Sequence, residues 1–233
     1  NLNKIVDCCK ISSGDNNYFE LIDKVLSFKK PTIISTGLLS KPEIFNLFKH
    51  IKKKKFPLKK LYFLHCVSDY PVKNNEANLL SIKYLKNFIG ENIGYSDHTL
   101  GTEAAIVATA YGAKIIEKHF TIDKNYSNFR DHKLSADTSE MTNLVYSVRK
   151  VRQMMGKMNK LISKSEQKNY SSMRRSLYFK NKIVKGSKIL KSDLKIIRPF
   201  VKLAPNQINK VLNKKIKITQ NVNQLVKLKN IKN

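Results

Sequence analysis

Two histidines stand in similar positions, each directly after an apolar segment of the chain. His98 lies in the stretch GYSDHT at 94–99, and His119 lies in EKHF at 117–120. Neutral imidazole is a good ligand for divalent transition metals, so two such side chains brought together could share one ion. An ion held by so few protein ligands keeps positions open for water or substrate and can polarise a carbonyl oxygen. The alternative is that both are ordinary hydrogen-bonded loop histidines.

A second group consists of one cation and three hydroxyl side chains near the ends of apolar segments. Its members are Lys10, Ser13, Ser35 and Ser96. Together they could hold a phosphate and a carboxylate through charge-assisted hydrogen bonds. Singly, a serine in such a position is often a helix N-cap, so only the cluster indicates an anion site. Asp131 and His132, in the later stretch FRDHK, either add acceptors for a hydroxylated substrate or are simply polar loop residues.

Five short segments rich in β-forming residues position these polar side chains. They are IVDCCKI (5–11), PTIIS (31–35), KLYFLHC (60–66), NIGYS (92–96) and KIIEKHF (114–120). The intervening stretches carry helical patterns: one has Ser40 as N-cap and Pro42 in its first turn, and another ends at Gly112. Strands and helices that alternate in this way predict an α/β fold with a parallel sheet covered on both faces.

The polar residues crowd at the C-terminal ends of all five segments. In a (β/α)8 barrel this edge is where loops from different strands build the active site, whereas an open doubly wound sheet would load only the loops at its switch point. We therefore expect a (β/α)8 TIM barrel. Because five strands do not close such a barrel and the sequence does not begin with Met, we expect roughly three N-terminal βα units to lie outside it.

The chain changes character after residue 156. Residues 1–156 form the expected partial barrel domain, and the polar, Ser- and Lys-rich stretch at 157–173 is typical of a linker. From 174 to 233, Asp193 is the only acidic residue, and short strand-like pieces replace helices. We expect a separate small β-rich domain there.

The formal net charge is +28, from 45 Lys and Arg against 17 Asp and Glu, and such an excess is typical of nucleic-acid or membrane-surface binding. The lysines, however, are scattered through every segment, and aromatic residues do not alternate with them as a stacking platform requires. No apolar run reaches the roughly 18–20 residues of a membrane span. We therefore expect neither nucleic acid nor a membrane as partner, while an anionic small substrate fits the charge.

The cysteines predict no covalent framework. Cys8, Cys9 and Cys66 form no CxxC pair, and adjacent residues of a strand point to opposite faces. The N-terminal stretch also lacks the pattern of a signal peptide. We expect a cytoplasmic protein with free thiols.

In combination, the motifs resemble those of the sialic acid (N-acetylneuraminate) synthases, a family that includes legionaminic and pseudaminic acid synthases. KISSGD, IISTG, LHCVSDYP, GYSDHTLG, EKHFTID and the DHKLSAD loop occur in the family's order. The stretch RRSLYFKNKIVKGSKILKSDLKIIRP is similar to the family's C-terminal SAF domain, which resembles type III antifreeze protein. The resemblance covers nearly the whole chain.

This resemblance implies a reaction and a cofactor. The family condenses phosphoenolpyruvate with an acetamido sugar such as N-acetylmannosamine, which gives a nine-carbon 2-keto acid and phosphate. A Mn²⁺ or Mg²⁺ ion, at positions matched here by His98 and His119, binds the open-chain aldehyde oxygen and makes its carbon electrophilic.

The resemblance also implies roles for single residues. Positions that hold phosphoenolpyruvate are matched by Lys10, Ser13, Ser35, Ser68 and Ser96. Tyr70 and Asp131 match contacts to the sugar, and Asp15 matches a glutamate with a proton-transfer role. Arg198 matches the arginine that the SAF domain of a partner subunit lays over the sugar's acetamido group, which implies a domain-swapped homodimer.

Several departures from the family pattern stand out. Asp15 is one methylene shorter than the usual Glu, and Ser68 replaces an Asn of some members. The usual KRPG reads IRPF at 197–200. The family's first strands, with an acidic residue and a second phosphate-binding Lys, have no counterpart in the sequence.

Two other functions remain compatible with the sequence. One is a different phosphoenolpyruvate-condensing or aldolase-type barrel, which would need neither Arg198 nor a SAF domain. The other is an inactive basic fragment with a binding role only, for which salt-sensitive binding to DNA or heparin is expected.

Overall fold

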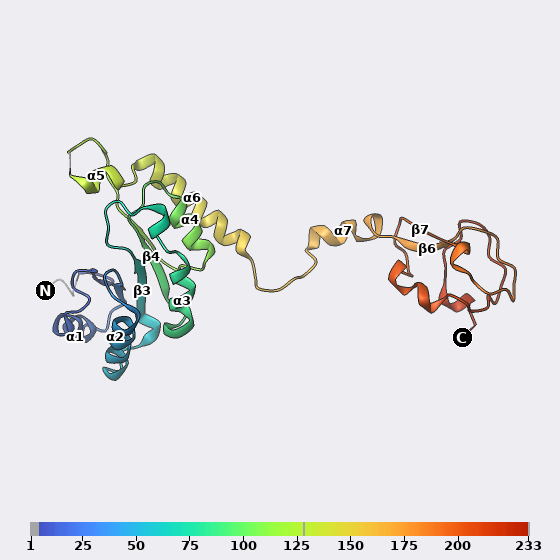
Figure 1. Ribbon diagram of the computed structural model, residues 1–233, viewed down its shortest axis with the longest axis horizontal. Coiled ribbons are helices and arrows are strands. Elements are labelled where there is room, and N and C mark those ends of the chain that lie inside the picture. Colours follow the sequence, from blue (N-terminus) through green and yellow to red (C-terminus); the bar gives the residue numbers. More distant parts are fainter. Residues whose placement is uncertain (1–4, 128, 233) are drawn as a thin grey trace. The chain divides into compact units, whose positions relative to one another are not determined.

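The computed structural model describes residues 5–127 and 129–232. The chain divides into two compact units, Asn1–Lys157 and Met158–Asn233 (Figure 1). Each unit has its own cluster of buried hydrophobic residues.

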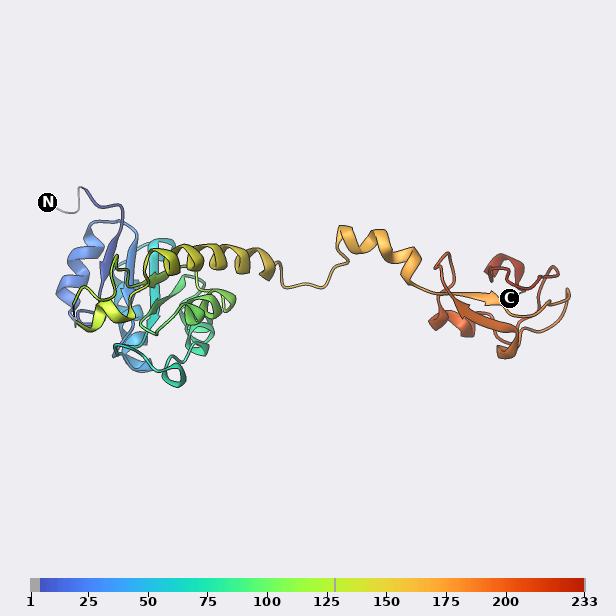
Figure 2. The ribbon, with the colours of Figure 1, turned by 90° about the horizontal axis from the view of Figure 1, so that it is seen from above.

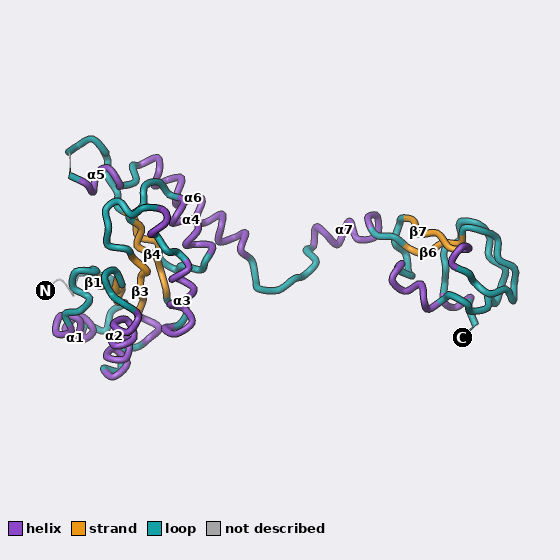
Figure 3. Tube along the Cα trace, viewed as in Figure 1, coloured by secondary structure: helices purple, strands orange, loops and turns teal. Residues whose placement is uncertain are grey.

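The first unit is built on a five-stranded, wholly parallel sheet in the order β1-β2-β3-β4-β5. Figure 3 draws the strands in orange. Its strands are β1 (Cys9–Ile11), β2 (Thr32–Ser35), β3 (Leu61–Cys66), β4 (Ile93–Asp97) and β5 (Ile116–Lys118). Each strand coincides with one of the five segments predicted from the sequence, although β4 extends one residue past its segment, to Asp97, and the two edge strands β1 and β5 are shorter than predicted. The α/β class and the parallel sheet are thereby confirmed.

Helices connect these strands, as parallel pairing requires. They are α1 (Phe19–Ser27), α2 (Lys41–Lys53), α3 (Leu80–Ile89) and α4 (Glu103–Ala110), followed after β5 by α5 (Arg130–Leu134) and α6 (Thr138–Met155). Helix α6 packs against α4 (Figure 2). Helix α5 forms in the stretch predicted as a polar loop, so Asp131 and His132 lie on a short helix.

The predicted helix boundaries have local causes. At the start of α2, the backbone N–H of Ser40 donates to Glu43 Oε2 at 2.7 Å, and Pro42 occupies the first turn. After α4, Gly112 adopts a φ of 88°, a left-handed conformation that favours glycine at a helix end. Both sequence predictions are confirmed.

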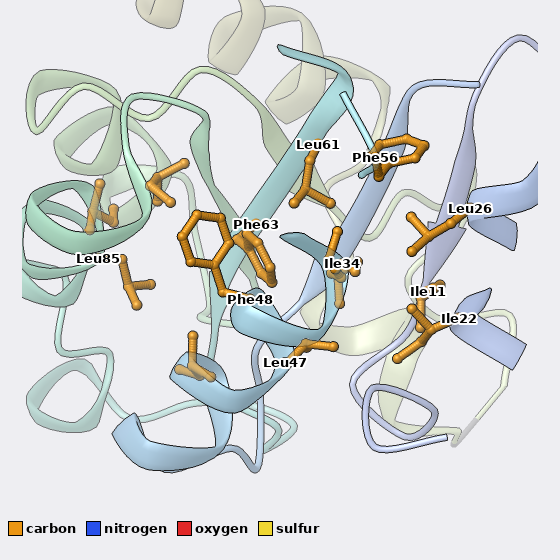
Figure 4. Close-up of a cluster of buried hydrophobic side chains, with 14 of the residues drawn as sticks. Ile11, Ile22, Leu26, Ile34, Leu47, Phe48, Phe56, Leu61, Phe63 and Leu85 are labelled. Carbon is orange, nitrogen blue, oxygen red and sulfur yellow. The ribbon is translucent and has the colours of Figure 1, made fainter. Parts of the chain in front are cut away.

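The core of the first unit lies between the sheet and the helices that cover it (Figure 4). Ile34 and Phe63 project from β2 and β3 and are fully buried, and they meet Leu47 from α2 and Ile22 from α1. Burying one such side chain stabilises the fold by about 1.5–3 kcal/mol. Neighbouring residues of a strand point to opposite faces, so Ser35, next to Ile34, faces away from this core.

The second unit combines one α-helix with short extended segments. It contains α7 (Lys164–Met173) and an antiparallel pair of strands, β6 (Ser176–Phe179) and β7 (Leu194–Ile197). Its buried cluster includes Leu177, Phe179 and Val211. Helix α7 falls inside the stretch 157–173 that was predicted as a linker; Ser163 Oγ accepts from Glu166 N at 3.1 Å and starts the helix.

Among the helices of the described residues, none has the length and apolar character to cross a bilayer.

Candidate active site

The parallel register brings the C-terminal ends of the five strands to one edge of the sheet. A cavity of about 320 Å³ opens there, among the ends of β1 to β5. Of the residues predicted from the sequence, those that line it are Lys10, Ser13, Ser35, Ser68, Tyr70, Ser96, His98 and His119. The strand ends thus gather a cation, hydroxyls and imidazoles around one space.

The two histidines face each other across this cavity. Their ring centroids are 5.3 Å apart and the ring planes meet at 69°. The ring of Tyr70 lies 4.2 Å from that of His98 and 5.8 Å from that of His119, so the phenol covers both imidazoles. His119 Nδ1 also lies 3.9 Å from Asp131 Oδ2. Asp131, which was predicted to contact the sugar, therefore lies at the rim of the same site.

His98 is oriented from behind by the chain that follows β3. Its Nδ1 lies 2.8 Å from the carbonyl oxygen of Val67, an acceptor that requires a proton on Nδ1 and leaves Nε2 as the other ring nitrogen of the neutral form. This arrangement, with one ring nitrogen tied to a backbone carbonyl, is typical of metal-ligating histidines.

Burial and neighbouring groups act differently on the two imidazoles. Burial opposes the charge of His98, but the nearby Cys66 thiol and the Val67 carbonyl outweigh it and raise the pKa of His98. Burial and then the adjacent charge of His98 lower the pKa of His119. For Cys66, burial is outweighed by hydrogen bonds that involve His98 and Ser13, and the pKa of the thiol is lowered.

The histidine pair fits a divalent ion in its spacing. Imidazole nitrogens lie about 2.0–2.1 Å from a bound ion such as zinc, which puts the centroids of two rings on one ion roughly 5 Å apart. The observed 5.3 Å agrees with this spacing. Across residues 5–127 and 129–232, no three His, Cys, Asp or Glu side chains are grouped to hold a metal, so two histidines would leave the other positions to water or substrate.

Beside the histidines lies a set of hydroxyl groups without internal partners. Within the described part of the chain, the buried Oγ atoms of Ser35 and Ser68 have no hydrogen-bond partner, and Ser35 is only 1% exposed. Buried polar groups are nearly always satisfied, so these two hydroxyls indicate a polar ligand. Gly37 leaves room for it: a Cβ there would lie 2.2 Å from Ser68 Oγ and 2.6 Å from Ser13 Oγ.

Lys10 and Ser96 meet at a residue that was not among the predicted site residues, Glu117. Its Oε1 accepts from Ser96 Oγ at 2.7 Å and lies 3.3 Å from Lys10 Nζ. The register pairs Ser96 with Glu117 across β4 and β5. The signal was present in EKHF, because Glu117 lies two residues before His119 and therefore on the same face of the strand.

Two further predicted residues lie outside the cavity. Asp15 accepts from Ser12 Oγ at 2.7 Å in the turn after β1 and does not line the space. Arg198 belongs to the second unit, where its Nε donates to the carbonyl of Met173 at 2.8 Å. The roles expected for Asp15 and Arg198 therefore stay predictions.

Behind the site, a buried ion pair joins the ends of β4 and β5. Lys118 Nζ lies 3.0 Å from Asp97 Oδ2, with side-chain exposures of 2% and 0%. Asp97 Oδ1 also accepts from the N–H of Thr99 at 2.9 Å and from its hydroxyl at 2.8 Å. Since Asp97 precedes His98 and Lys118 precedes His119, the pair fixes the two strand ends that carry the imidazoles.

Fold and site together define a class: α/β proteins whose parallel strands end at a pocket lined by a lysine, hydroxyl groups and two imidazoles. Comparison with known proteins identifies the family within this class. The pattern of the NeuB family matches residues 2–160, and the chain belongs to this family.

Individual relatives agree with this placement. An uncharacterized protein of Methanocaldococcus jannaschii is 39% identical over 217 residues, which cover 93% of this chain and 64% of that protein. The N,N'-diacetyllegionaminic acid synthase of Campylobacter jejuni is 38% identical over 190 residues, which cover 82% of this chain and 57% of that protein. The chain spans less than two thirds of the length of either relative.

A solved structure shows the same architecture. The N-acetylneuraminic acid synthetase of Leptospira borgpetersenii, crystallised with citrate, superimposes with a TM-score of 0.66 at 36% identity. The superposition covers 71% of this chain and 56% of that one. The five-stranded parallel sheet is thus consistent with part of a TIM barrel.

Proposed function

We propose that this chain is part of a nonulosonic acid synthase that condenses phosphoenolpyruvate with N-acetylmannosamine or a related acetamido sugar. The products are a nine-carbon 2-keto acid and phosphate. One observation carries the proposal: at the strand ends, two facing imidazoles adjoin Lys10 and the unpartnered hydroxyls of Ser35 and Ser68. Its relatives include synthases of this class.

The part of the cavity lined by Lys10, Ser13, Ser35, Ser68 and Ser96, which we call the anion pocket, would bind phosphoenolpyruvate. Lys10 supplies a cation, and the hydroxyls of Ser13, Ser35, Ser68 and Ser96 supply donors for phosphate and carboxylate oxygens. Charge-assisted hydrogen bonds of this kind are the strong ones in proteins, and a fixed cavity makes them with little reorganisation. Phosphoenolpyruvate would thereby be held with its C3 toward the histidines.

His98 and His119 would hold a Mn²⁺ or Mg²⁺ ion, which when bound supplies a Lewis acid for the aldehyde oxygen of the sugar. In the overall reaction C3 of phosphoenolpyruvate bonds to the aldehyde carbon, water adds to C2, and the C–O bond to phosphate breaks. Tyr70 and Asp131 would contact the sugar at the rim. Asp15 would take part in proton transfer from the turn after β1.

We propose that the sheet continues into a (β/α)8 barrel. A groove of about 840 Å³ runs along the open edge of β5 and is lined on its far side by Met141, Val145 and Val148 of α6. An exposed strand edge next to an apolar helix face is the arrangement that a further βα unit covers. Longer relatives of the chain have the length for such units.

For the second unit we propose a SAF domain. Arg198 would reach over the acetamido group of the sugar in the site of a partner subunit, and the assembly would be a domain-swapped homodimer. The free thiols of the three cysteines are in keeping with a cytoplasmic location.

A condensation assay tests the proposed function. The protein is incubated with phosphoenolpyruvate, Mn²⁺ and either N-acetylmannosamine or an aldose phosphate, and phosphate and 2-keto acid are measured. We expect product from the acetamido sugar, and none in the His119→Ala variant. Activity on aldose phosphates alone would reject this choice in favour of another phosphoenolpyruvate-condensing barrel.

A further inference from the structure

The carboxylate of Glu117 lies in the anion pocket and contacts two of its side chains. The carboxylate contacts Lys10 Nζ at 3.3 Å and Ser96 Oγ at 2.7 Å, and the side chain of Glu117 lines the cavity with the two histidines. Lys10 and Ser96 are two of the donors that the proposed function assigns to phosphoenolpyruvate. A carboxylate of the protein therefore holds the groups that an incoming anion needs.

A purely structural role explains little of this arrangement. The side chains of Lys10 and Glu117 are 34% and 36% exposed, and an ion pair so open to solvent adds little to stability. The buried pair Lys118–Asp97 already joins β4 to β5 on the opposite face of the sheet. The main physical consequence of the Glu117 carboxylate is thus its field inside the cavity.

That field opposes a bound anion. Two negative charges a few ångströms apart repel strongly at the effective dielectric of a protein surface. Phosphate oxygens placed on Lys10 would replace the Glu117 carboxylate as its partner. Lys10 and Ser96 can therefore bind either the Glu117 carboxylate or an anion from solution.

We propose that Glu117 is an internal counter-ion of the anion pocket. It holds Lys10 and Ser96 in place before the substrate binds, yields them to the phosphate group, and takes them back as inorganic phosphate leaves. The proposal rests on the proposed function for the identity of the anion. The Glu117 carboxylate would favour product release, because it competes with inorganic phosphate for Lys10 and Ser96 and so lowers the affinity of the pocket for phosphate.

The substitution Glu117→Gln separates the charge from the shape. Glutamine keeps the length of the side chain and an oxygen that accepts from Ser96, while the repulsion of an anion disappears. We expect inorganic phosphate to bind at least about tenfold more tightly to this variant than to the unaltered protein. A residue with only a structural role would weaken the site or leave it unchanged when replaced.

The experiment is a calorimetric titration of the full chain with inorganic phosphate at physiological ionic strength. Glu76→Gln serves as the matched control, because Glu76 also faces a lysine, Lys73 at 3.9 Å, but does not line the cavity. Glu117→Ala provides a second variant without the charge, and circular dichroism verifies that each protein is folded.

Tighter phosphate binding in both Glu117 variants, with Glu76→Gln unchanged, is the expected result. Equal or weaker binding in the Glu117 variants, against measurable binding by the unaltered protein, overturns the counter-ion role and leaves the anion site in place. Absence of phosphate binding in every protein overturns both the counter-ion role and the anion site on which the proposed function depends.

Discussion

Replacing Lys118 by methionine is expected to lower the free energy of unfolding of the first unit by about 3–5 kcal/mol. Lys118 and Asp97 are 2% and 0% exposed and lie 3.0 Å apart. Methionine fills much of the lysine's volume but leaves the Asp97 carboxylate buried without its cation. Burial and then the charge of Asp97 raise the pKa of Tyr95, whose hydroxyl donates to Asp97 Oδ1 at 3.3 Å.

Denaturation by urea, followed by circular dichroism, measures the effect. Lys73→Met is the control, because Lys73 forms an exposed pair with Glu76 at 3.9 Å and its loss should cost less than about 1 kcal/mol. The double variant Asp97→Asn with Lys118→Met should recover part of the loss, since no unpaired charge remains buried. Equal midpoints for Lys118→Met and Lys73→Met would contradict this account of the pair.

Replacing Lys10 by methionine is expected to weaken the binding of phosphoenolpyruvate by roughly 10- to 150-fold. Lys10 is the cation among the cavity-lining residues of the described chain, and a hydrogen bond to a charged group contributes about 1.5–3 kcal/mol. Methionine retains the apolar stem and removes the charge. The effect is the reverse of that expected for Glu117→Gln at the same contact.

A binding titration with phosphoenolpyruvate measures this loss. Because the chain carries 45 Lys and Arg, it is performed at physiological salt, where charges farther than about 8 Å are screened. Lys114→Met is the matched control: Lys114 precedes β5 at the opposite end of the strand, where its Nζ donates to Asn92 Oδ1 at 3.0 Å. If Lys10→Met and Lys114→Met bound phosphoenolpyruvate equally well, the anion pocket would not lie where we place it.

Much of the site follows from strand periodicity alone. Ser96 and His98 are two apart and share a face of the sheet, as do Glu117 and His119, so sequence spacing predicts which side chains gather at the strand ends. Polar residues in buried strands need partners or a ligand, which made the strand ends informative. Lys10, Ser35, Ser96, His98 and His119, which were predicted in this way, all line the cavity, whereas Tyr70 was predicted only from the family resemblance.

What the sequence could not supply is register and three-dimensional pairing. The contact of Glu117 with Lys10 joins residues from β5 and β1, the two edge strands, and no local pattern predicts it. Similarly, the burial of Lys118 depends on how β5 lies against β4. Helix α7 was missed because its polar residues show no apolar face, and none of its residues is buried.

Mn²⁺ binding, followed by electron paramagnetic resonance, tests the central claim most directly. We expect the protein to bind one ion per chain, His98→Ala and His119→Ala each to abolish that binding, and His50→Gln to retain it, because His50 pairs with Asp23 at 2.7 Å and does not line the cavity. Undiminished Mn²⁺ binding by both alanine variants would contradict the claim that these two imidazoles form the metal site.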